Sequence, residues 1–209
     1  MTILSKIDQR GRSMVEMLGV LAIIGVLSVG GISGYSKAMA KFKLTKAQDQ
    51  MSMLLMNVRT AFATSPSYEG LNNGSAVSFG IAPADMTTAV KGAVSTILSK
   101  GTKLTNAFGG EVYVSSCDTD DIVGSYTCSD ATYLNTSNTE PGQYFAISFH
   151  NLSRDACFAL GGIDWGADGL MGITINGNEH TSNEFPIKLA TVGSNCNSYA
   201  DNIITWVYY

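Results

Sequence analysis

The chain has 209 residues, of which 45% are hydrophobic and 14% are charged. This length is enough to bury one sizeable core, so we expect one domain plus an appendage and exclude two full catalytic domains. The formal net charge is -4, and the second half of the chain contains no cluster of Lys and Arg. Because nucleic-acid binding takes much of its affinity from such clusters, we expect no nucleic-acid partner.

An apolar segment lies near the beginning of the sequence. Residues 17–32 carry no charge and, with Met14 and Val15, approach the roughly 20 apolar residues that span a bilayer. An ordinary signal peptide is one interpretation, because basic residues precede the segment. However, the segment starts late, no small-x-small cleavage site ends it, and it continues without a break into a helical pattern. These features favour a helix that spans a membrane.

A single carboxylate, Glu16, stands at the front edge of this segment. An ionisable side chain inside a bilayer costs about 2.5 to 3.5 kcal/mol even on the lenient insertion scale, so Glu16 needs a cationic partner. Two charges buried in an apolar environment are tolerable only as a pair.

Residues 10–16, Arg-Gly-Arg-Ser-Met-Val-Glu, resemble the processing site of type IV prepilins. In that family a peptidase cuts after a glycine, and the fifth residue of the mature chain is glutamate. Gly11 and Glu16 have this spacing. The resemblance implies that residues 1–11 are a leader and that prepilin peptidase cuts between Gly11 and Arg12. It also implies that Glu16 neutralises the new terminal amine of a neighbouring subunit. Arg12 departs from the family, which usually has Phe, Met or Leu there and methylates the new amine.

More basic residues follow the apolar segment than precede it: Lys37, Lys41, Lys43 and Lys46 against Lys6, Arg10 and Arg12. The positive-inside rule therefore does not by itself orient the segment in the membrane. The resemblance orients it, and implies a precursor in the inner membrane and a mature protein in an extracellular pilus filament.

A helical pattern continues beyond the apolar segment. Residues 12–35 are expected to form a hydrophobic helix that serves first as a transmembrane segment and then in polymerisation, and residues 36–64 its amphipathic continuation. Ser65 and Pro66 end the pattern. Apolar residues recur at three- and four-residue steps and predict a stripe facing a head of residues 65–209: Ala47, Met51, Leu54, Leu55, Val58 and Phe62.

The first part of the head reads as a loop over residues 66–80 and a helix over residues 82–99. Pro83 suits the first turn of that helix, and Asp85 suits the positive end of its dipole, so we assign Asp85 no catalytic role. Residues 104–110 form a predicted turn that leads into a strand beginning at Glu111. Their Asn-aromatic-Gly segment resembles type IVb pilins, the class of the toxin-coregulated pilus and of conjugative thin pili.

Three further segments predict strands: residues 143–149, 170–175 and 203–209, with Asn176-Gly177 as a turn. The last of them is hydrophobic enough to lie centrally in a sheet. Together with the resemblance, the pattern predicts an α+β pilin fold, in which a long N-terminal α-helix, half of it transmembrane, packs on an antiparallel β-sheet head.

The four cysteines all lie in the last half of the chain, and none forms a Cys-x-x-Cys pair suited to zinc or dithiol chemistry: Cys117, Cys128, Cys157 and Cys196. An even count in a turn-rich region favours two disulfides in an oxidising compartment, with four free thiols as the alternative. Four cysteines allow three pairings. Type IVb pilins join a cysteine on a short helix to one near the C-terminus. This implies a Cys157–Cys196 bond, with residues 153–161 as that helix, capped by Ser153, and leaves Cys117 to pair with Cys128.

No residue set predicts a metal, a cofactor or catalysis. His150 and His180 lack the spacing of a metal-binding helix motif, and Asp164 and Asp168 only faintly match a calcium loop. No nucleophile-base-acid set is readable, so we expect no enzyme.

The leading hypothesis is a structural subunit of a type IV pilus, which mediates adhesion, aggregation or conjugative contact. Its expected partners are prepilin peptidase, the inner membrane, the pilus assembly machinery and identical subunits in a helical filament. A minor pilin or a pseudopilin of type II secretion is a related alternative. A membrane-anchored extracytoplasmic binding protein or enzyme, and a soluble secreted domain, are alternatives from other classes.

Overall fold

The computed structural model describes residues 8–87, 103–117, 122–123, 126–127, 142–166 and 169–209. The chain divides into two units, Met1–Phe42 and Lys43–Tyr209. Helix α1 (Asp8–Ala61) contributes residues to both.

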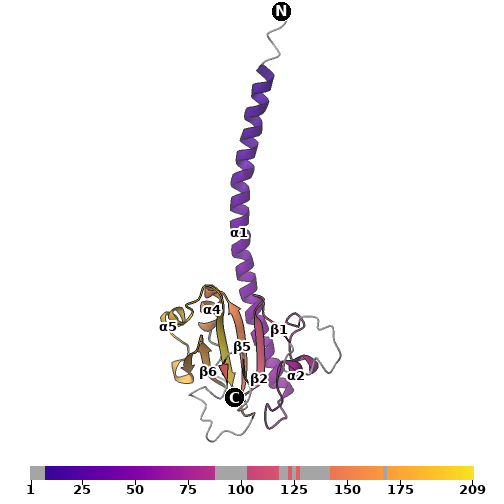
Figure 1. Cartoon of the computed structure of the whole chain (residues 1–209), viewed down its shortest axis with the longest axis vertical. Helices are drawn as coiled ribbons and strands as arrows, with labels where there is room; N and C mark the ends of the chain where they lie inside the picture. Colours follow the sequence, from indigo (N-terminus) through magenta and orange to yellow (C-terminus); the bar gives the residue numbers. More distant parts are fainter. Residues whose placement is uncertain (1–7, 88–102, 118–121, 124–125, 128–141, 167–168) are drawn as a thin grey trace, which may run out of the picture. The chain divides into compact units, whose positions relative to one another are not determined.

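The first unit consists of the apolar part of α1, drawn in indigo and violet (Figure 1). The side chains of residues 14–38 are all exposed to solvent in the isolated chain. No core of this unit's own supports the helix, so its stability depends on surroundings outside the unit. Helix α1 ends at Ala61, three residues before the predicted end, and residues 62–64 form a turn.

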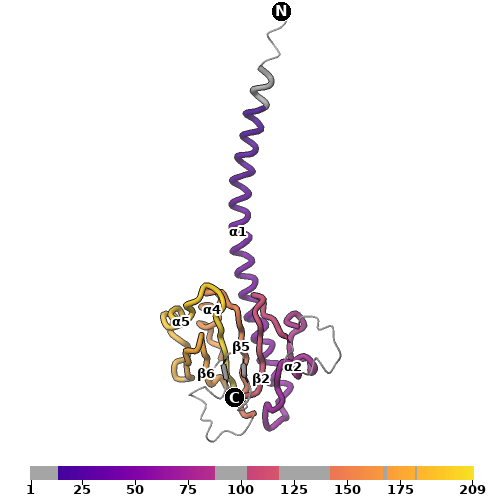
Figure 2. The backbone as a smooth tube through the Cα atoms, in the orientation of Figure 1, coloured from indigo at the N-terminus to yellow at the C-terminus, as the bar shows by residue number. Residues whose placement is uncertain are grey.

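The second unit is the head, built on an antiparallel sheet in the order β1-β2-β5-β8-β6-β7. Its strands are β1 (Leu104–Thr105), β2 (Glu111–Ser116), β5 (Phe145–Leu152), β6 (Leu170–Ile175), β7 (Asn178–Thr181) and β8 (Asn202–Tyr208). A separate pair is formed by β3 (Ile122–Val123) and β4 (Tyr126–Thr127). Strand β8 lies between β5 and β6, so its predicted central position is confirmed (Figures 1 and 2). Asn176 and Gly177, with φ of 49° and 81°, form the predicted turn between β6 and β7.

The core of the head lies between one face of this sheet and the second half of α1. The predicted stripe is confirmed, because Ala47, Met51, Leu54 and Val58 have no exposed surface. Alternate residues of the strands meet them, including Phe145, Ile147 and Phe149 of β5 and Ile204, Trp206 and Tyr208 of β8. On the opposite face, Ala146 and Val207 belong to a separate small cluster. The two-residue period of the strands thus separates two faces, one of which buries α1.

The remaining helical elements are short: α2 (Asn73–Ser78), α4 (Arg154–Gly161), the 3-10 turn η2 (Ser182–Glu184) and α5 (Leu189–Asn195). Helix α4 agrees with the predicted short helix, and the Ser153 hydroxyl accepts a hydrogen bond from the Ala156 amide at its start. The Cys157–Cys196 disulfide ties α4 to the residue that follows α5, as expected from the resemblance.

Two predictions for the first part of the head, the start of a helix at residue 82 and a loop over residues 66–80, are wrong. The helix expected from residue 82 is absent from residues 82–87, which form a turn and a bridge between Thr87 and Leu104; residues 88–99 lie outside the described part. The Thr105 amide donates to the Met86 carbonyl, so tertiary pairing uses backbone groups that a helix would need.

The loop expected over residues 66–80 contains α2. Asn72 and Ser75 form a capping box, each side chain accepting a hydrogen bond from the other residue's backbone amide. Asn73 is 4% exposed, donates to the Val112 carbonyl and accepts from the Val114 amide. Polar residues of α2 are therefore buried against β2. Their polar composition is typical of a loop, and for this reason the sequence did not predict the helix.

Candidate functional site

The predicted processing and assembly residues lie at the beginning of α1. Gly11 and Arg12 are in its first turns, and the Arg12 side chain is outside the described part of the structure. Glu16 is exposed, and its neighbours Val15 and Met17 are 71% and 65% exposed. A carboxylate therefore stands among apolar side chains that the rest of its own unit does not cover.

The apolar part of α1 needs a cover from outside the chain. Among the described residues, α1 is the one helix long and apolar enough to cross a membrane, and none of its most apolar stretch is buried. Many large apolar side chains there are 54% to 75% exposed, from Met14 to Ile32. Water is a poor solvent for such a surface, so lipid or other protein must surround it.

The glycines of this segment have no role within the chain's own packing. A Cβ atom added to any of them would meet nothing within 4 Å: Gly19, Gly25, Gly30, Gly31 and Gly34. Each glycine weakens a helix by about 1 kcal/mol relative to alanine. Small residues allow other helices to approach closely, which is an intermolecular use of the same positions.

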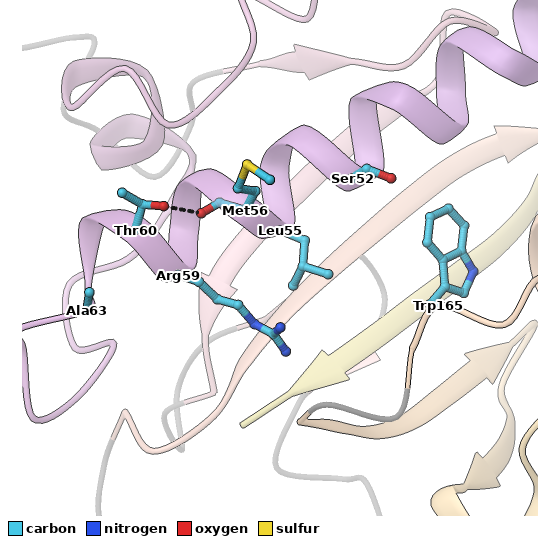
Figure 3. Close-up of a pocket in the computed structure, with 7 residues that line it drawn as sticks. All are labelled: Ser52, Leu55, Met56, Arg59, Thr60, Ala63 and Trp165. Atoms are coloured by element: carbon cyan, nitrogen blue, oxygen red, sulfur yellow. Dashed lines mark hydrogen bonds between the residues drawn. The ribbon is translucent and has the colours of Figure 1, made fainter.

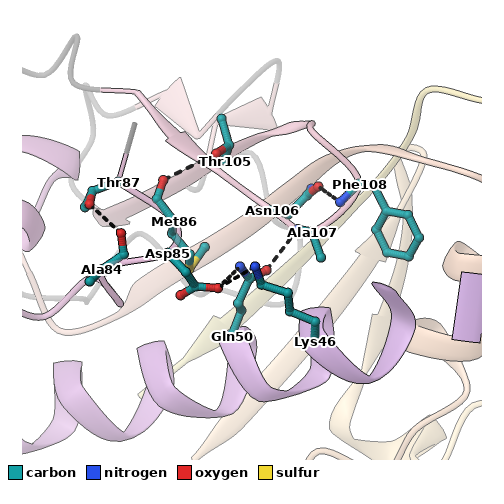
Figure 4. A network of polar contacts seen from close by, with 10 residues as sticks. All are labelled: Lys46, Gln50, Ala84, Asp85, Met86, Thr87, Thr105, Asn106, Ala107 and Phe108. Carbon is teal, nitrogen blue, oxygen red and sulfur yellow. Dashed lines mark hydrogen bonds and ion pairs between the residues drawn. The ribbon is translucent and has the colours of Figure 1, made fainter. Parts of the chain in front are cut away.

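A polar network attaches the head half of α1 to two loops (Figure 4). Asp85 accepts a hydrogen bond from Gln50 Nε2 at 2.8 Å and forms an ion pair with Lys46 Nζ at 3.1 Å. The other end of the Gln50 amide accepts a hydrogen bond from the Ala107 backbone N–H at 3.0 Å. Gln50 is 2% exposed, so its amide joins the turn at Asp85 to the loop at Ala107 across a buried position.

This network explains both the lowered pKa and the structural role of the Asp85 carboxyl group. Partial burial alone would raise the pKa of its carboxyl, but the hydrogen bond from Gln50 and the charge of Lys46 hold the pKa below the ordinary value. The stabilisation is therefore present above about pH 4, the ordinary pKa of Asp, and is lost as the pH falls further. Asp85 links α1 to a turn and does not begin a helix.

The Asn-aromatic-Gly segment forms a loop fixed by its own asparagine. The Asn106 Oδ1 atom accepts from the backbone amides of Phe108 and Gly110 at 2.9 and 3.0 Å, and Asn106 Nδ2 donates to the His150 carbonyl at 2.9 Å. A Cβ atom on Gly110 would lie 1.9 Å from that carbonyl oxygen. Only glycine fits this approach, so the segment fixes the position of the loop against the sheet.

An apolar groove of about 520 Å³ lies beside the second half of α1 (Figure 3). It is lined by Ser52, Leu55, Met56, Arg59, Thr60, Ala63 and Trp165. Leu55 and Arg59 project from α1, and the Arg59 guanidinium lies 5.4 Å from the centre of the Tyr208 ring. The Trp165 indole N–H donates to the Leu160 carbonyl at 2.9 Å, which holds the ring against Trp206. The groove therefore has one apolar wall on α1 and an aromatic wall on the loop after α4.

The two histidines are structural. His180 is 5% exposed and lies between the Glu184 carboxylate, 2.8 Å from Nδ1, and the Asn195 amide, 2.7 Å from Nε2. Burial lowers the pKa of His150, although the charge of Glu111 partly opposes this. Over the residues described, no group of three His, Cys, Asp or Glu side chains is placed to hold a metal ion.

The remaining predicted site residues are the cysteines and the two aspartates of the loop that faintly matches a calcium site. The Cys157–Cys196 bond is present and both cysteines are fully buried. Cys128 and Asp168 lie outside the described residues, so the pairing of Cys128 with Cys117 stays a prediction. Asp164 accepts a hydrogen bond from the Gly166 amide, which is a local turn.

Known proteins resemble the chain in both sequence and fold. The family model described as PilS N terminal matches residues 123–209. The type IVb pilin from Salmonella typhi has 21% sequence identity, a TM-score of 0.51, and a match covering 79% of this chain and 97% of that chain. The type IV pilin TcpA from Vibrio cholerae El Tor biotype has 13% identity and a TM-score of 0.45, over 80% of this chain and 99% of that chain. No curated protein matches the chain.

The fold is that of a type IV pilin. The predicted α+β class, the long N-terminal helix and the antiparallel sheet are therefore confirmed, as is the resemblance to type IVb pilins. Sequence reasoning found the apolar helix of this pilin fold because its signal is local. It missed the groove, because Arg59 and Trp165 are more than 100 residues apart in sequence and no local pattern joins them.

Proposed function

We propose that the chain is the precursor of a type IV pilus subunit, a structural protein and not an enzyme. The observation that carries this proposal is a pilin-fold head attached to a helix whose apolar surface is exposed throughout residues 14–38. That surface needs lipid in the precursor and protein in a filament, and one helix serves both environments in turn.

In this proposal, prepilin peptidase cuts after Gly11 while the apolar segment is in the inner membrane. The new ammonium group on Arg12 then pairs with Glu16 of a neighbouring subunit. Either charge alone would be expensive in an apolar bundle, whereas the pair is tolerable. The pilus assembly machinery draws identical subunits into an extracellular helical filament, and the heads supply its surface for adhesion, aggregation or conjugative contact.

Intact mass and N-terminal sequencing of the native protein test the processing step. We expect a mature chain that begins at Arg12. A native chain that still begins at Met1, or one that has lost the apolar residues 17–32, would contradict the proposal.

Substitution of Glu16 tests the assembly step. We expect Glu16→Ala and the isosteric Glu16→Gln to insert into the membrane at normal levels and to lose most filaments in the sheared fraction. The matched control is Asp49→Ala, which removes an exposed carboxylate from the head half of the same helix and should leave filament yield unchanged. Normal filaments from both Glu16 variants would refute the role of the charge pair.

A second candidate within the same class is a minor pilin or a pseudopilin of type II secretion, which would share the fold and the processing. The amount of the chain in sheared filaments separates these possibilities, since a major subunit dominates that fraction. A membrane-anchored binding protein or enzyme remains the alternative from another class, and it predicts an unprocessed N-terminus.

A further inference from the structure

The residues that follow the apolar part of α1 have the composition of a membrane interface. Tyr35 and Phe42 are 67% and 63% exposed, and Lys37 and Lys41 between them are also exposed. Tyrosine is enriched where a membrane helix leaves the hydrocarbon, because its ring is apolar and its hydroxyl group is polar. We call residues 35–42 the interfacial segment.

The length of the apolar part matches the thickness of a bilayer. Residues 14–34 rise about 31 Å along a helix, and the hydrocarbon core of a bilayer is about 30 Å thick. The backbone of Lys37 then lies about 4 Å beyond the hydrocarbon, within the polar layer, and that of Lys41 about 10 Å beyond it. Side chains on a helix point towards its N-terminus, so both lysine side chains incline back towards the bilayer. The interfacial segment therefore lies at the level of the lipid head groups.

No acid of α1 lies close to these lysines. Residues 17–48 contain four lysines and no Asp or Glu. The next acid along the helix is Asp49, eight residues after Lys41 and so about 12 Å further from the apolar part. In the head, the Asp85 carboxylate is already paired with Lys46 at 3.1 Å. The interfacial segment therefore presents net positive charge at the depth where a bilayer carries its phosphates.

We propose that the interfacial segment binds the phosphate groups of anionic phospholipids, in the leaflet where α1 leaves the bilayer towards the head. Lys37 and Lys41 are four residues apart and so lie on the same side of the helix, where their two ammonium groups can hold one phosphate between them. A zwitterionic lipid has its own cation beside the phosphate, so the lysines favour a lipid with net negative charge.

The inference rests on the proposed pilus function, because it needs the apolar part of α1 in a membrane. It deepens that function by naming the class of lipid that the unassembled subunit binds. It also gives a role to the lysines that follow the apolar segment. A subunit that enters a filament gives up these lipids, so the contact favours retention of unassembled subunits in the bilayer.

Native mass spectrometry of the full chain in a mild non-ionic detergent tests this binding, because it counts the lipids that stay bound. The probes are dioleoylphosphatidylglycerol, which is anionic, and dioleoylphosphatidylcholine, which is zwitterionic. The parent chain should bind the anionic lipid about 30-fold more tightly, since each of two lysines beside an anionic lipid surface contributes about fivefold. Lys37→Gln combined with Lys41→Gln should bind the two lipids equally. Both positions are exposed, so the substitutions should leave folding unchanged.

Two control variants separate position from overall charge. Lys37→Arg combined with Lys41→Arg keeps both charges and should retain the preference for the anionic lipid. Lys103→Gln combined with Lys188→Gln removes two exposed lysines of the head and should also retain it. Glycerol phosphate carries the phosphate without a lipid tail, and at the same concentration as the lipid it should not displace it.

Three results would overturn the lipid contact while leaving the pilus function intact. They are equal binding of the two lipids by the parent chain, an equal loss of preference in the head control, and displacement of the lipid by glycerol phosphate. Recovery of the unassembled native chain in the aqueous fraction, without detergent, would instead refute the pilus function itself.

Discussion

The buried amide of Gln50 provides the sharpest test of how the head is attached to α1. In Gln50→Leu the part-buried Ala107 N–H loses its acceptor at 3.0 Å, and Asp85 loses a donor at 2.8 Å. An unsatisfied backbone amide costs about 1 to 3 kcal/mol. The Asp85 side chain is 42% exposed and keeps Lys46, so water offsets most of its loss. We therefore expect the head to lose about 2 kcal/mol of unfolding free energy.

Thermal unfolding of the full chain in a mild non-ionic detergent measures this loss. The chain has two tryptophans, Trp165 and Trp206, and both are in the head, so their fluorescence reports on the head alone. For a domain of this size, about 2 kcal/mol corresponds to a melting temperature lower by about 4 to 8 °C.

The matched control for Gln50→Leu is Asp85→Asn. The new amide oxygen still accepts from Gln50, and only the half-exposed ion pair with Lys46 is lost. Exposed pairs contribute about 0 to 1 kcal/mol, so this variant should melt within about 4 °C of the parent. Equal melting temperatures for Gln50→Leu and the parent, or an equal loss in Asp85→Asn, would refute the assignment of the amide as the bridge.

Two further predictions concern the head. Replacing both Cys157 and Cys196 with serine should cost about 4 kcal/mol in the chain-entropy model, given their separation of 39 residues; thermal unfolding checks this, and a loss below about 1 kcal/mol would contradict it. Because burial lowers the pKa of His150, the unfolded chain takes up a proton at about pH 6.5 that the folded chain does not, so stability should fall as the pH drops below that value. His150→Gln should reduce the fall between pH 7.5 and 5.5, and an unchanged slope in melting temperature would show that another group causes it.

The parts of this protein that follow from sequence are those with a local cause. An uncharged apolar segment next to Glu16 needs no tertiary contact to be helical, and the α1 stripe from Ala47 to Val58 follows from the 3.6-residue period. Helix α4 carries its own cap in Ser153, and Asn176-Gly177 has the chemistry of a tight turn. The α+β class and the family resemblance depended on these local signals.

Helix α5 and strand β7 depend on tertiary contacts that no local sequence pattern predicts. Helix α5 has no side-chain cap, since Lys188 makes no capping hydrogen bond, and it is held by burial of Val192 and by the disulfide next to it. Strand β7 is short and polar, and it exists because β6 pairs with it. Neither was predicted, because packing and not propensity stabilises both.

Sequence alone determined that this chain has an apolar helix whose surface must be buried against lipid or protein, and that one acid lies at the edge of that helix. It also determined that an apolar stripe on the same helix packs against a head built on a β-sheet. Tertiary structure decided that Asp85 belongs to a bridge and not to a helix, since Gln50 reaches it from a distant segment. It also decided where the groove of Arg59 and Trp165 lies. The physical reason is that hydrophobic period and capping act within a few residues, whereas a bridge or a groove exists only when folding brings remote side chains together.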